Sequence, residues 1–393
     1  MNRRRLLEAL GAATAVGLAG CARSADGGGG SDDSGNGAGD SGSGAGTEGE
    51  GASPDESGEV VRGPRGEVEL PVPAEEIDEV VGENDIPAIT RPVFGPDWSD
   101  AEYDLADEDR VVGVVRAGEA RAYPLPILDW HEVVNDTLGG PLLVTYCPLC
   151  GSGVTAERRV DGEETTFGVS GKLWRSDLVM YDEATESLWS QILGTAIRGP
   201  RTGDRLSLVP STITTWGQWR TDHPETRVLL PPPDSGTVVP SAPRNYGIDP
   251  YAGYDDSDDI GVSPTNEFDD DRLHPKTRVV GVAVEDAAKA YPFGRVAETG
   301  VVNDRVGDLP VVVAAGAGET LSAFDRHVDG EALEFEPAGE DRMRADGSTW
   351  TRSSGVAVDG PYEGSRLDDA ARVSTEFWFA WLNFHPDTTV YGE

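Results

Sequence analysis

Two cysteines separated by two residues are the side chains best suited to chemistry in this 393-residue chain. Cys147 and Cys150 lie in Val144-Thr-Tyr-Cys-Pro-Leu-Cys-Gly-Ser-Gly153, and the chain has only one other cysteine, Cys21. A Cys-x-x-Cys turn commonly serves as a thiol–disulfide couple, as half of a metal site or as a structural disulfide. We favour a metal site and keep the other two uses as alternatives.

A metal site would need further ligands, because Cys-Pro-x-Cys-Gly is only half of a zinc-ribbon-like site and occurs once. His131 is the best candidate, and two soft thiolates with one imidazole suit Cu(I) or Zn. Met180 is a weak fourth ligand, although a packing methionine explains it better. We interpret Asp129, Glu132, Asp177 and Asp182 as surface carboxylates in a very acidic chain and assign no catalytic residue.

The two alternatives lack part of their usual context. Thioredoxin-like enzymes place their thiols at the start of a helix, whose dipole lowers the thiol pKa, whereas Gly151-Ser-Gly153 and an extended run follow here. A structural disulfide between Cys147 and Cys150 would close a very short loop and would therefore stabilise the fold little.

The cysteines need rigid elements to position them, and the flanking sequence supplies strands. The apolar run 141–146 predicts a buried strand that leads into the pair, and residues 154–160 predict a second strand closed by Asp161-Gly162, a hairpin turn. Helices are predicted over 129–135 and over 211–223, the latter capped by Ser211. The pattern indicates a β-rich α+β fold.

Several motifs recur at a constant spacing. Arg110-Val-Val-Gly-Val114 recurs as Arg278-Val-Val-Gly-Val282 and Val133-Val-Asn-Asp136 as Val301-Val-Asn-Asp304, each 168 residues later (278 − 110; 301 − 133). We therefore predict two tandem copies of one domain, related by a pseudo-twofold axis. The first copy spans 61–230, a linker spans 231–275, and a degenerate second copy spans 276–393.

The recurrence also separates functional from structural residues. At the offset of 168, Cys147, Cys150 and His131 face Ala315, Gly318 and Thr299, so none of the three is required by the fold. His223 keeps a counterpart in His385, and we interpret it as structural, at a helix end.

The first 60 residues predict export and anchoring. Residues 1–21 carry Arg3-Arg4-Arg5, a short apolar run and Leu18-Ala-Gly-Cys21, which resemble a twin-arginine signal and a lipobox. Cys21 would bear the lipid and hold the protein on the outer face of the cell membrane. Residues 22–60 are Gly, Ser, Asp and Glu with almost nothing apolar, which predicts a disordered acidic tether.

The formal net charge of −39 excludes one class of partner. Nucleic acid is not expected, because phosphate binding needs a basic surface. Acidity dispersed through the whole chain resembles the composition of halophilic proteins, with nonspecific cation binding as the rival interpretation. Protein partners are not assigned.

A set of motifs in a fixed order resembles the DUF3179 family, a domain of unknown function. The motifs are Trp130-His-Glu-Val-Val-Asn-Asp136, Thr145-Tyr-Cys-Pro-Leu-Cys-Gly-Ser152, Phe167-Gly-Val-Ser-Gly171, Ser176-Asp-Leu-Val-Met-Tyr-Asp182 and Ser187-Leu-Trp-Ser-Gln191. The resemblance spans about residues 84–390 and leaves the activity open. Two functions remain: an exported lipoprotein with a metal or redox centre, or a non-enzymatic envelope binding module with a structural disulfide.

Overall fold

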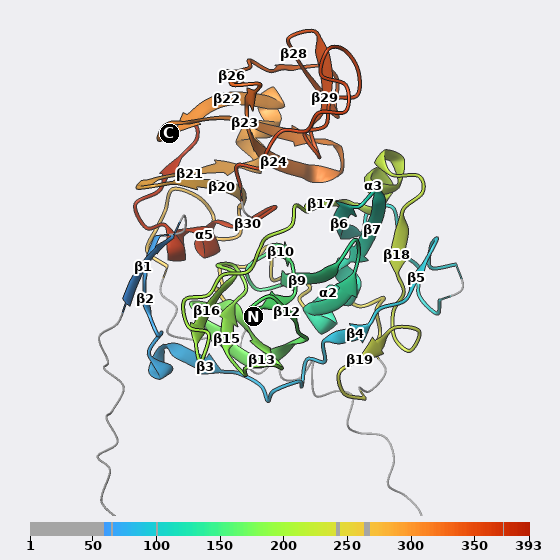
Figure 1. Cartoon of the computed structure of the whole chain (residues 1–393), viewed down its shortest axis with the longest axis vertical. Coiled ribbons are helices and arrows are strands. Elements are labelled where there is room, and N and C mark those ends of the chain that lie inside the picture. The colour runs from blue at the N-terminus through green and yellow to red at the C-terminus, as the bar shows by residue number, and fades with distance from the viewer. Residues whose placement is uncertain (1–58, 64–65, 100, 241–243, 263–267, 372) are drawn as a thin grey trace, which may run out of the picture.

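The computed structural model describes residues 59–63, 66–99, 101–240, 244–262, 268–371 and 373–393 (Figure 1). The predicted signal segment 1–21, its lipid-bearing Cys21 and nearly all of the tether 22–60 lie outside the described residues. Among the described helices, none is long and apolar enough to span a membrane.

Six sheets of three or more strands build the molecule. In spatial order they contain β16 (Thr195–Arg198), β15 (Leu188–Ser190), β14 (Asp177–Asp182), β13 (Phe167–Trp174) and β3 (Ile77–Glu79); β10 (Ser152–Ala156), β9 (Pro141–Cys147), β8 (Val133–Thr137), β4 (Ile89–Arg91) and β19 (Gly236–Thr237); β17 (Thr212–Thr215), β6 (Arg110–Arg116), β7 (Glu119–Pro124), β18 (Arg227–Leu229) and β5 (Phe94–Gly95); β30 (Glu376–Phe377), β20 (Arg278–Val284), β21 (Ala287–Pro292) and β31 (Thr389–Val390); β22 (Val301–Val306), β23 (Leu309–Gly316) and β24 (Thr320–Asp325); and β27 (Glu336–Pro337), β28 (Arg342–Ala345) and β29 (Ser348–Thr351).

Short hairpins and helices complete the described residues. Three two-stranded sheets pair β1 (Glu59–Gly63) with β2 (Gly66–Leu70), β11 (Arg159–Val160) with β12 (Glu163–Glu164), and β25 (His327–Val328) with β26 (Glu331–Ala332). The four α-helices among the described residues have seven residues each: α2 (Leu125–His131), α3 (Trp216–Asp222), α4 (Phe293–Thr299) and α5 (Trp378–Phe384). Two 3-10 turns, η1 (Ala74–Glu76) and η2 (Ala317–Glu319), are shorter still.

The predicted fold class, an α+β protein made of two tandem pseudo-twofold copies, is wrong. The chain is mostly sheet, and its six larger sheets resemble a six-bladed β-propeller. A helix of seven residues makes only two turns, so the helices cannot form a layer that covers a sheet. Short apolar runs separated by Gly and Pro turns produce many short strands instead.

The recurring motifs correspond to recurring strand pairs. Val111 lies opposite Pro124 in the β6–β7 pair, and Val279 lies opposite Pro292 in the β20–β21 pair. In the next pair the register shifts by one residue, because Val133 faces Thr145 in β8–β9 whereas Val301 faces Ala314 in β22–β23. The position that corresponds to Cys147 is therefore Gly316 and not Ala315.

Both predicted helices have different bounds. Residues 133–137 form the strand β8 rather than the end of a helix over 129–135, because Val133 and Val134 are completely buried in a sheet. Residues 212–215 likewise form β17, so Thr215, not Ser211, caps α3 by accepting from the Gln218 amide. The β-branched run Thr212-Ile-Thr-Thr215 favours a strand over a helix start.

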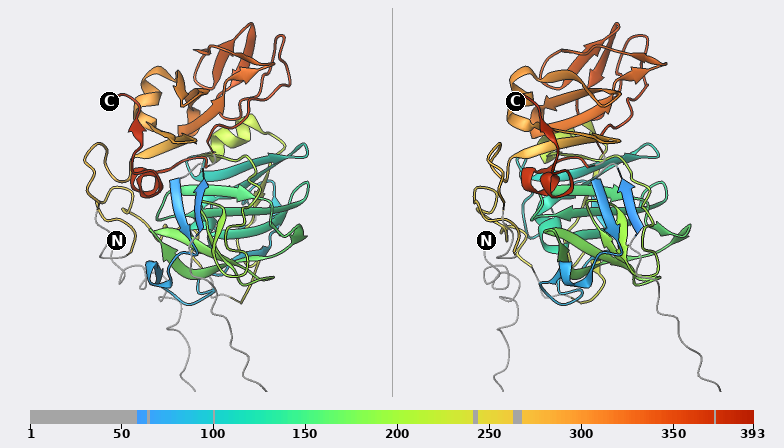
Figure 2. Two further views of the ribbon diagram at one scale, coloured as in Figure 1. Left: turned by 60° about the vertical axis from the view of Figure 1, so that its left-hand side comes forward. Right: turned by 90° about the vertical axis from the view of Figure 1, so that its left-hand side faces the viewer.

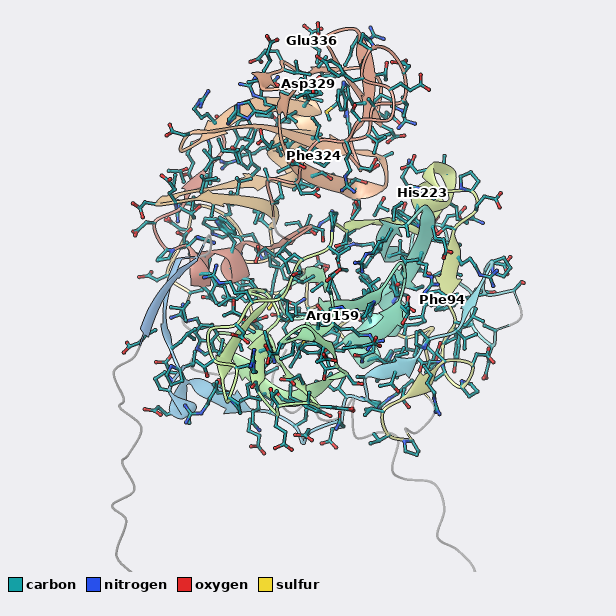
Figure 3. The ribbon with its side chains drawn as sticks, in the orientation of Figure 1. Phe94, Arg159, His223, Phe324, Asp329 and Glu336 are labelled. Carbon is teal, nitrogen blue, oxygen red and sulfur yellow. The ribbon has the colours of Figure 1, made fainter. Side chains whose placement is uncertain are left out.

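His223 and His385 do pack at helix ends as expected. The His223 ring lies 4.1 Å from the Trp219 ring beside α3, and the His385 ring lies 3.9 Å from the Trp381 ring after α5 (Figure 3). An imidazole packed on an indole is a structural contact, so these histidines hold helix ends in place.

The largest apolar core combines segments that are distant in sequence. It joins the cysteine turn to Trp174 and Met180 of the neighbouring sheet and to Phe377 and Phe379 near the end of the chain. The last helix, α5, lies at the junction between the two lobes of the molecule (Figure 2). The cysteine turn is therefore packed from both lobes.

Candidate functional site

The cysteine turn connects β9 to β10, as the sequence predicts. Cys147 ends β9 opposite Ser152, which begins β10, and the Cys150 amide donates to the Cys147 carbonyl over 3.1 Å. Gly151 completes the turn with a φ of +62°, a value that glycine adopts without strain. All residues of both strands are buried, so the turn is fixed on a rigid support.

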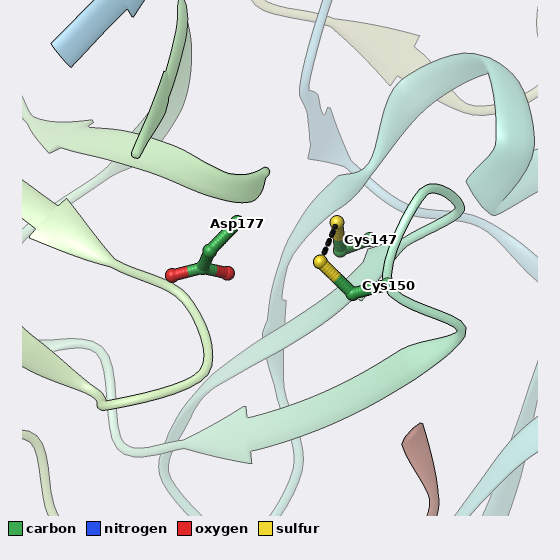
Figure 4. Close-up of side chains that lie close together, drawn as sticks. All are labelled: Cys147, Cys150 and Asp177. Atoms are coloured by element: carbon green, nitrogen blue, oxygen red, sulfur yellow. Dashed lines mark hydrogen bonds between the residues drawn. The ribbon is translucent and has the colours of Figure 1, made fainter. Parts of the chain in front are cut away.

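The two sulfur atoms face each other. Cys147 Sγ lies 2.9 Å from Cys150 Sγ (Figure 4), and both side chains are completely buried. The Ser176 carbonyl oxygen lies 3.1 Å from Cys150 Sγ and 3.8 Å from Cys147 Sγ. Because a carbonyl oxygen can only accept, these contacts place S–H donors on the cysteines.

Burial and negative neighbours both oppose ionisation of Cys150. Burial raises the pKa of its thiol well above the usual range, and the adjacent Cys147 and the carboxylates of Asp177 and Glu376 raise it further. The site therefore favours neutral sulfur over a thiolate.

Asp177 is the third side chain at the site. Its carboxylate and the two sulfurs lie within 4.8 Å of one another, which makes the group a possible metal site. The carboxylate is completely buried and accepts hydrogen bonds from the Ser190 hydroxyl and the Ile192 amide. Its interpretation as a surface carboxylate is wrong, and its place within the apolar strand Asp177-Leu-Val-Met180 is the sequence signal that pointed inward.

His131 is buried but directs both ring nitrogens elsewhere. Nδ1 lies 2.7 Å from the Pro87 carbonyl and must donate to it, so Nε2 of the neutral ring accepts from the Tyr246 hydroxyl at 2.8 Å. Burial lowers its pKa from 6.5 to about 4, which keeps the ring neutral. The structure thus brings Cys147 and Cys150 together with Asp177, and engages His131 in a separate hydrogen-bonded chain.

Met180 occupies the middle of β14. It lies opposite Val169 on one side and Trp189 on the other, and it is almost completely buried. Its neighbours account for it as a packing residue, and the possible metal group among the described residues does not include it.

A shell of hydrogen bonds holds the turn. Gln191 Nε2 donates to Thr145 Oγ1 and to the Ser152 carbonyl, both at 3.1 Å, and so links β9 to β10 from the adjacent sheet. On the other side the Tyr254 hydroxyl donates to the Leu149 carbonyl at 3.1 Å and accepts from the Gly261 amide at 2.9 Å. These contacts fix the backbone on both sides of Cys150.

A cation stands behind this tyrosine. The Lys276 ammonium lies 3.6 Å from the centre of the Tyr254 ring, and burial lowers its pKa to about 8. A partly desolvated ammonium over an aromatic face is attracted by the ring, so Lys276 helps to keep Tyr254 against the turn.

Comparison with known proteins identifies one family. The family described as "Protein of unknown function (DUF3179)" matches residues 83–388. No curated protein and no solved structure matches the chain.

Proposed function

Because the chain belongs to the DUF3179 family, whose function is unknown, we propose from the site itself that Cys147 and Cys150 form a redox couple. The two thiols are oxidised to a disulfide and reduced again, with the loss and gain of two electrons and two protons. The supporting observation is a buried pair of sulfurs 2.9 Å apart that faces a carbonyl oxygen.

The distance between the sulfurs is compatible with small movements in either direction. A disulfide needs about 2.05 Å, and two zinc ligands at about 2.3 Å from a tetrahedral ion lie about 3.8 Å apart. The observed distance of 2.9 Å is nearly midway. The surroundings decide, because the Ser176 carbonyl and burial stabilise neutral sulfur, whereas a metal site needs thiolates.

Metal binding is the second candidate, and Asp177 is the observation that favours it. Its carboxylate lies within 4.8 Å of both sulfurs, and the set of two thiolates with one carboxylate would suit Zn better than Cu(I). Asp177 would have to share an oxygen that already accepts from Ser190 and Ile192.

We place this couple in an exported protein anchored through a lipid on Cys21. The support is the sequence of residues 1–21. Disulfides form and persist outside the cytoplasm, so such a location suits a dithiol that is oxidised. Replacing Arg3 and Arg4 by lysine should leave precursor in the cytoplasm, and normal export of that variant would contradict a twin-arginine signal.

Thiol trapping and metal analysis test the site together. The purified protein is treated with hydrogen peroxide or with dithiothreitol, unfolded, alkylated and weighed by mass spectrometry. We expect both cysteines to be blocked from alkylation after oxidation and both to react after reduction, while Cys147→Ser forms no intramolecular disulfide. Two reactive thiols after oxidation, or one tightly bound metal ion per chain, would refute the redox proposal, and the metal ion would support the second candidate.

A further inference from the structure

Glu132 adopts a backbone conformation that its side chain makes unfavourable. It ends α2 with a φ of +56°, and its amide donates to the Leu128 carbonyl at 2.8 Å. The corresponding residue at the end of α4 is Gly300, with a φ of +74° and the same hydrogen bond, to Val296. Glycine adopts this conformation without cost, so a glutamate held here points to a role for its carboxyl group.

The Glu132 carboxyl group is directed into the protein beside the cysteine turn. The side chain is 7% exposed and lines a cavity of about 30 Å³ together with Leu149, the residue between the two cysteines. The Glu132 carbonyl accepts from the Tyr146 amide at 2.9 Å, which fixes the end of α2 next to Cys147. A cavity of this size has room for one water molecule.

The charge state of Glu132 is set by burial. Burial raises the pKa of the carboxyl group from 4.5 to about 8, and no hydrogen bond to a described residue offsets it. The titratable groups that face it are Asp129 on α2, Tyr251 across the cavity and the half-buried Lys172, which pairs with Glu79 at 3.3 Å. Tyr251 also senses the charge of Cys147, so the carboxyl group and the sulfurs border the same residue.

We propose that Glu132 accepts and returns the protons of the Cys147–Cys150 couple through the cavity. This role rests on the redox function proposed above. It explains why a carboxyl group occupies a position where the corresponding segment has glycine.

The chemistry balances with a hydroperoxide as oxidant. Ionised Glu132 takes the proton of one thiol, the thiolate attacks a peroxide oxygen, and the leaving hydroxide takes that proton to become water. The second thiol then displaces hydroxide from the sulfenic acid, and its proton makes the second water. In sum, two thiols and one hydrogen peroxide give one disulfide and two waters. Moving the negative charge from carboxylate to sulfur leaves the total charge of the buried site unchanged, which avoids the cost of ionising a thiol alone.

The test is the pH dependence of oxidation of the full chain by hydrogen peroxide, followed by thiol trapping. In the wild type the rate should rise as Glu132 ionises, near pH 8. Glu132→Gln should slow disulfide formation about 10²-fold at pH 8.5 and shift the rise to higher pH, where the thiol itself ionises. An unchanged rate and pH profile in Glu132→Gln would overturn the role of Glu132.

Two glycine variants separate this role from folding. Glu132→Gly relieves the backbone and should raise the thermal midpoint while slowing oxidation. Glu285→Gly is the matched control, because Glu285 is exposed in the β20–β21 turn with a φ of +51°. It should raise stability and leave oxidation unchanged; slowed oxidation in both variants would also refute the proposal. Failure of the wild type to form a disulfide would instead refute the redox function itself.

Discussion

Replacing Gly151 by alanine should destabilise the protein more than the same change at Gly162, and the difference measures how tightly the cysteine turn is packed. Both glycines have positive φ, +62° and +79°. A Cβ at residue 151 would lie 3.0 Å from three atoms of the Phe377 ring, whereas a Cβ at residue 162 would meet nothing within 4 Å. Gly162→Ala therefore reports the backbone cost alone.

The expected magnitudes follow from these contacts. The left-handed conformation costs alanine about 1–2 kcal/mol, and the stiffer unfolded chain returns about 0.4–1 kcal/mol. Gly162→Ala should then lower the free energy of unfolding by about 1 kcal/mol. Overpacking against a buried ring adds about 1–3 kcal/mol, so Gly151→Ala should lose about 2–4 kcal/mol in all.

Urea unfolding of the two variants, monitored by tryptophan fluorescence, provides the comparison. A double variant with Phe377→Leu tests the cause, because a smaller side chain at 377 should remove most of the extra loss. Phe377 also donates its amide to the Cys150 carbonyl at 2.8 Å, so the backbone contact stays in place in that variant. Equal losses for Gly151→Ala and Gly162→Ala would refute the argument that Phe377 packs against the turn.

Other predictions concern buried polar groups. The pKa of His131 is lowered from 6.5 to about 4, so its contribution to stability is present above pH 6.5 and is lost as pH falls toward 4; His131→Gln should remove this acid-dependent loss of about 3 kcal/mol in urea midpoints measured across that range. The pKa of Glu132 is raised from 4.5 to about 8, so its contribution is present below pH 4.5 and is lost as pH rises through 8; Glu132→Gln should flatten this limb, and a persistent limb would contradict the assignment. Asn135 makes two hydrogen bonds of 2.8 Å to the backbone of Phe167, and Asn135→Ala should cost about 2–3 kcal/mol in urea unfolding because it leaves both buried groups unpaired; a cost near zero would show that they are hydrated. Tyr254→Phe should cost about 1–3 kcal/mol and increase alkylation of the reduced cysteines, since it frees the Leu149 carbonyl from its hydrogen bond; unchanged alkylation would contradict a holding role.

Local sequence was sufficient for the turn that carries the cysteines. The apolar run before Cys147 and the glycine at position 151 predict a strand followed by a tight turn, and both are present. The Asp161-Gly162 hairpin is also present, with φ of +54° and +79°. These features depend on backbone preferences within a few residues, so no distant segment can change them.

Helix bounds and the overall architecture were not accessible in the same way. The segment 129–135 has a helical pattern, yet its second half pairs with β9 and becomes β8. Sheet pairing between distant strands outweighs a weak local preference for helix. The repeated motifs revealed recurring strand pairs but not how six sheets assemble, because the contacts between sheets are made by side chains with no fixed spacing in sequence.

The sequence by itself determined that Cys147 and Cys150 share a rigid turn, because three residues of separation and a glycine leave the chain few other choices. The tertiary structure alone decided which groups surround them. It placed Asp177 beside the sulfurs, turned both nitrogens of His131 toward Pro87 and Tyr246, and buried the carboxyl group of Glu132 beside the turn. Carboxylates in a chain this acidic look alike in sequence, and only burial distinguishes a surface charge from a group whose pKa and protonation state are altered.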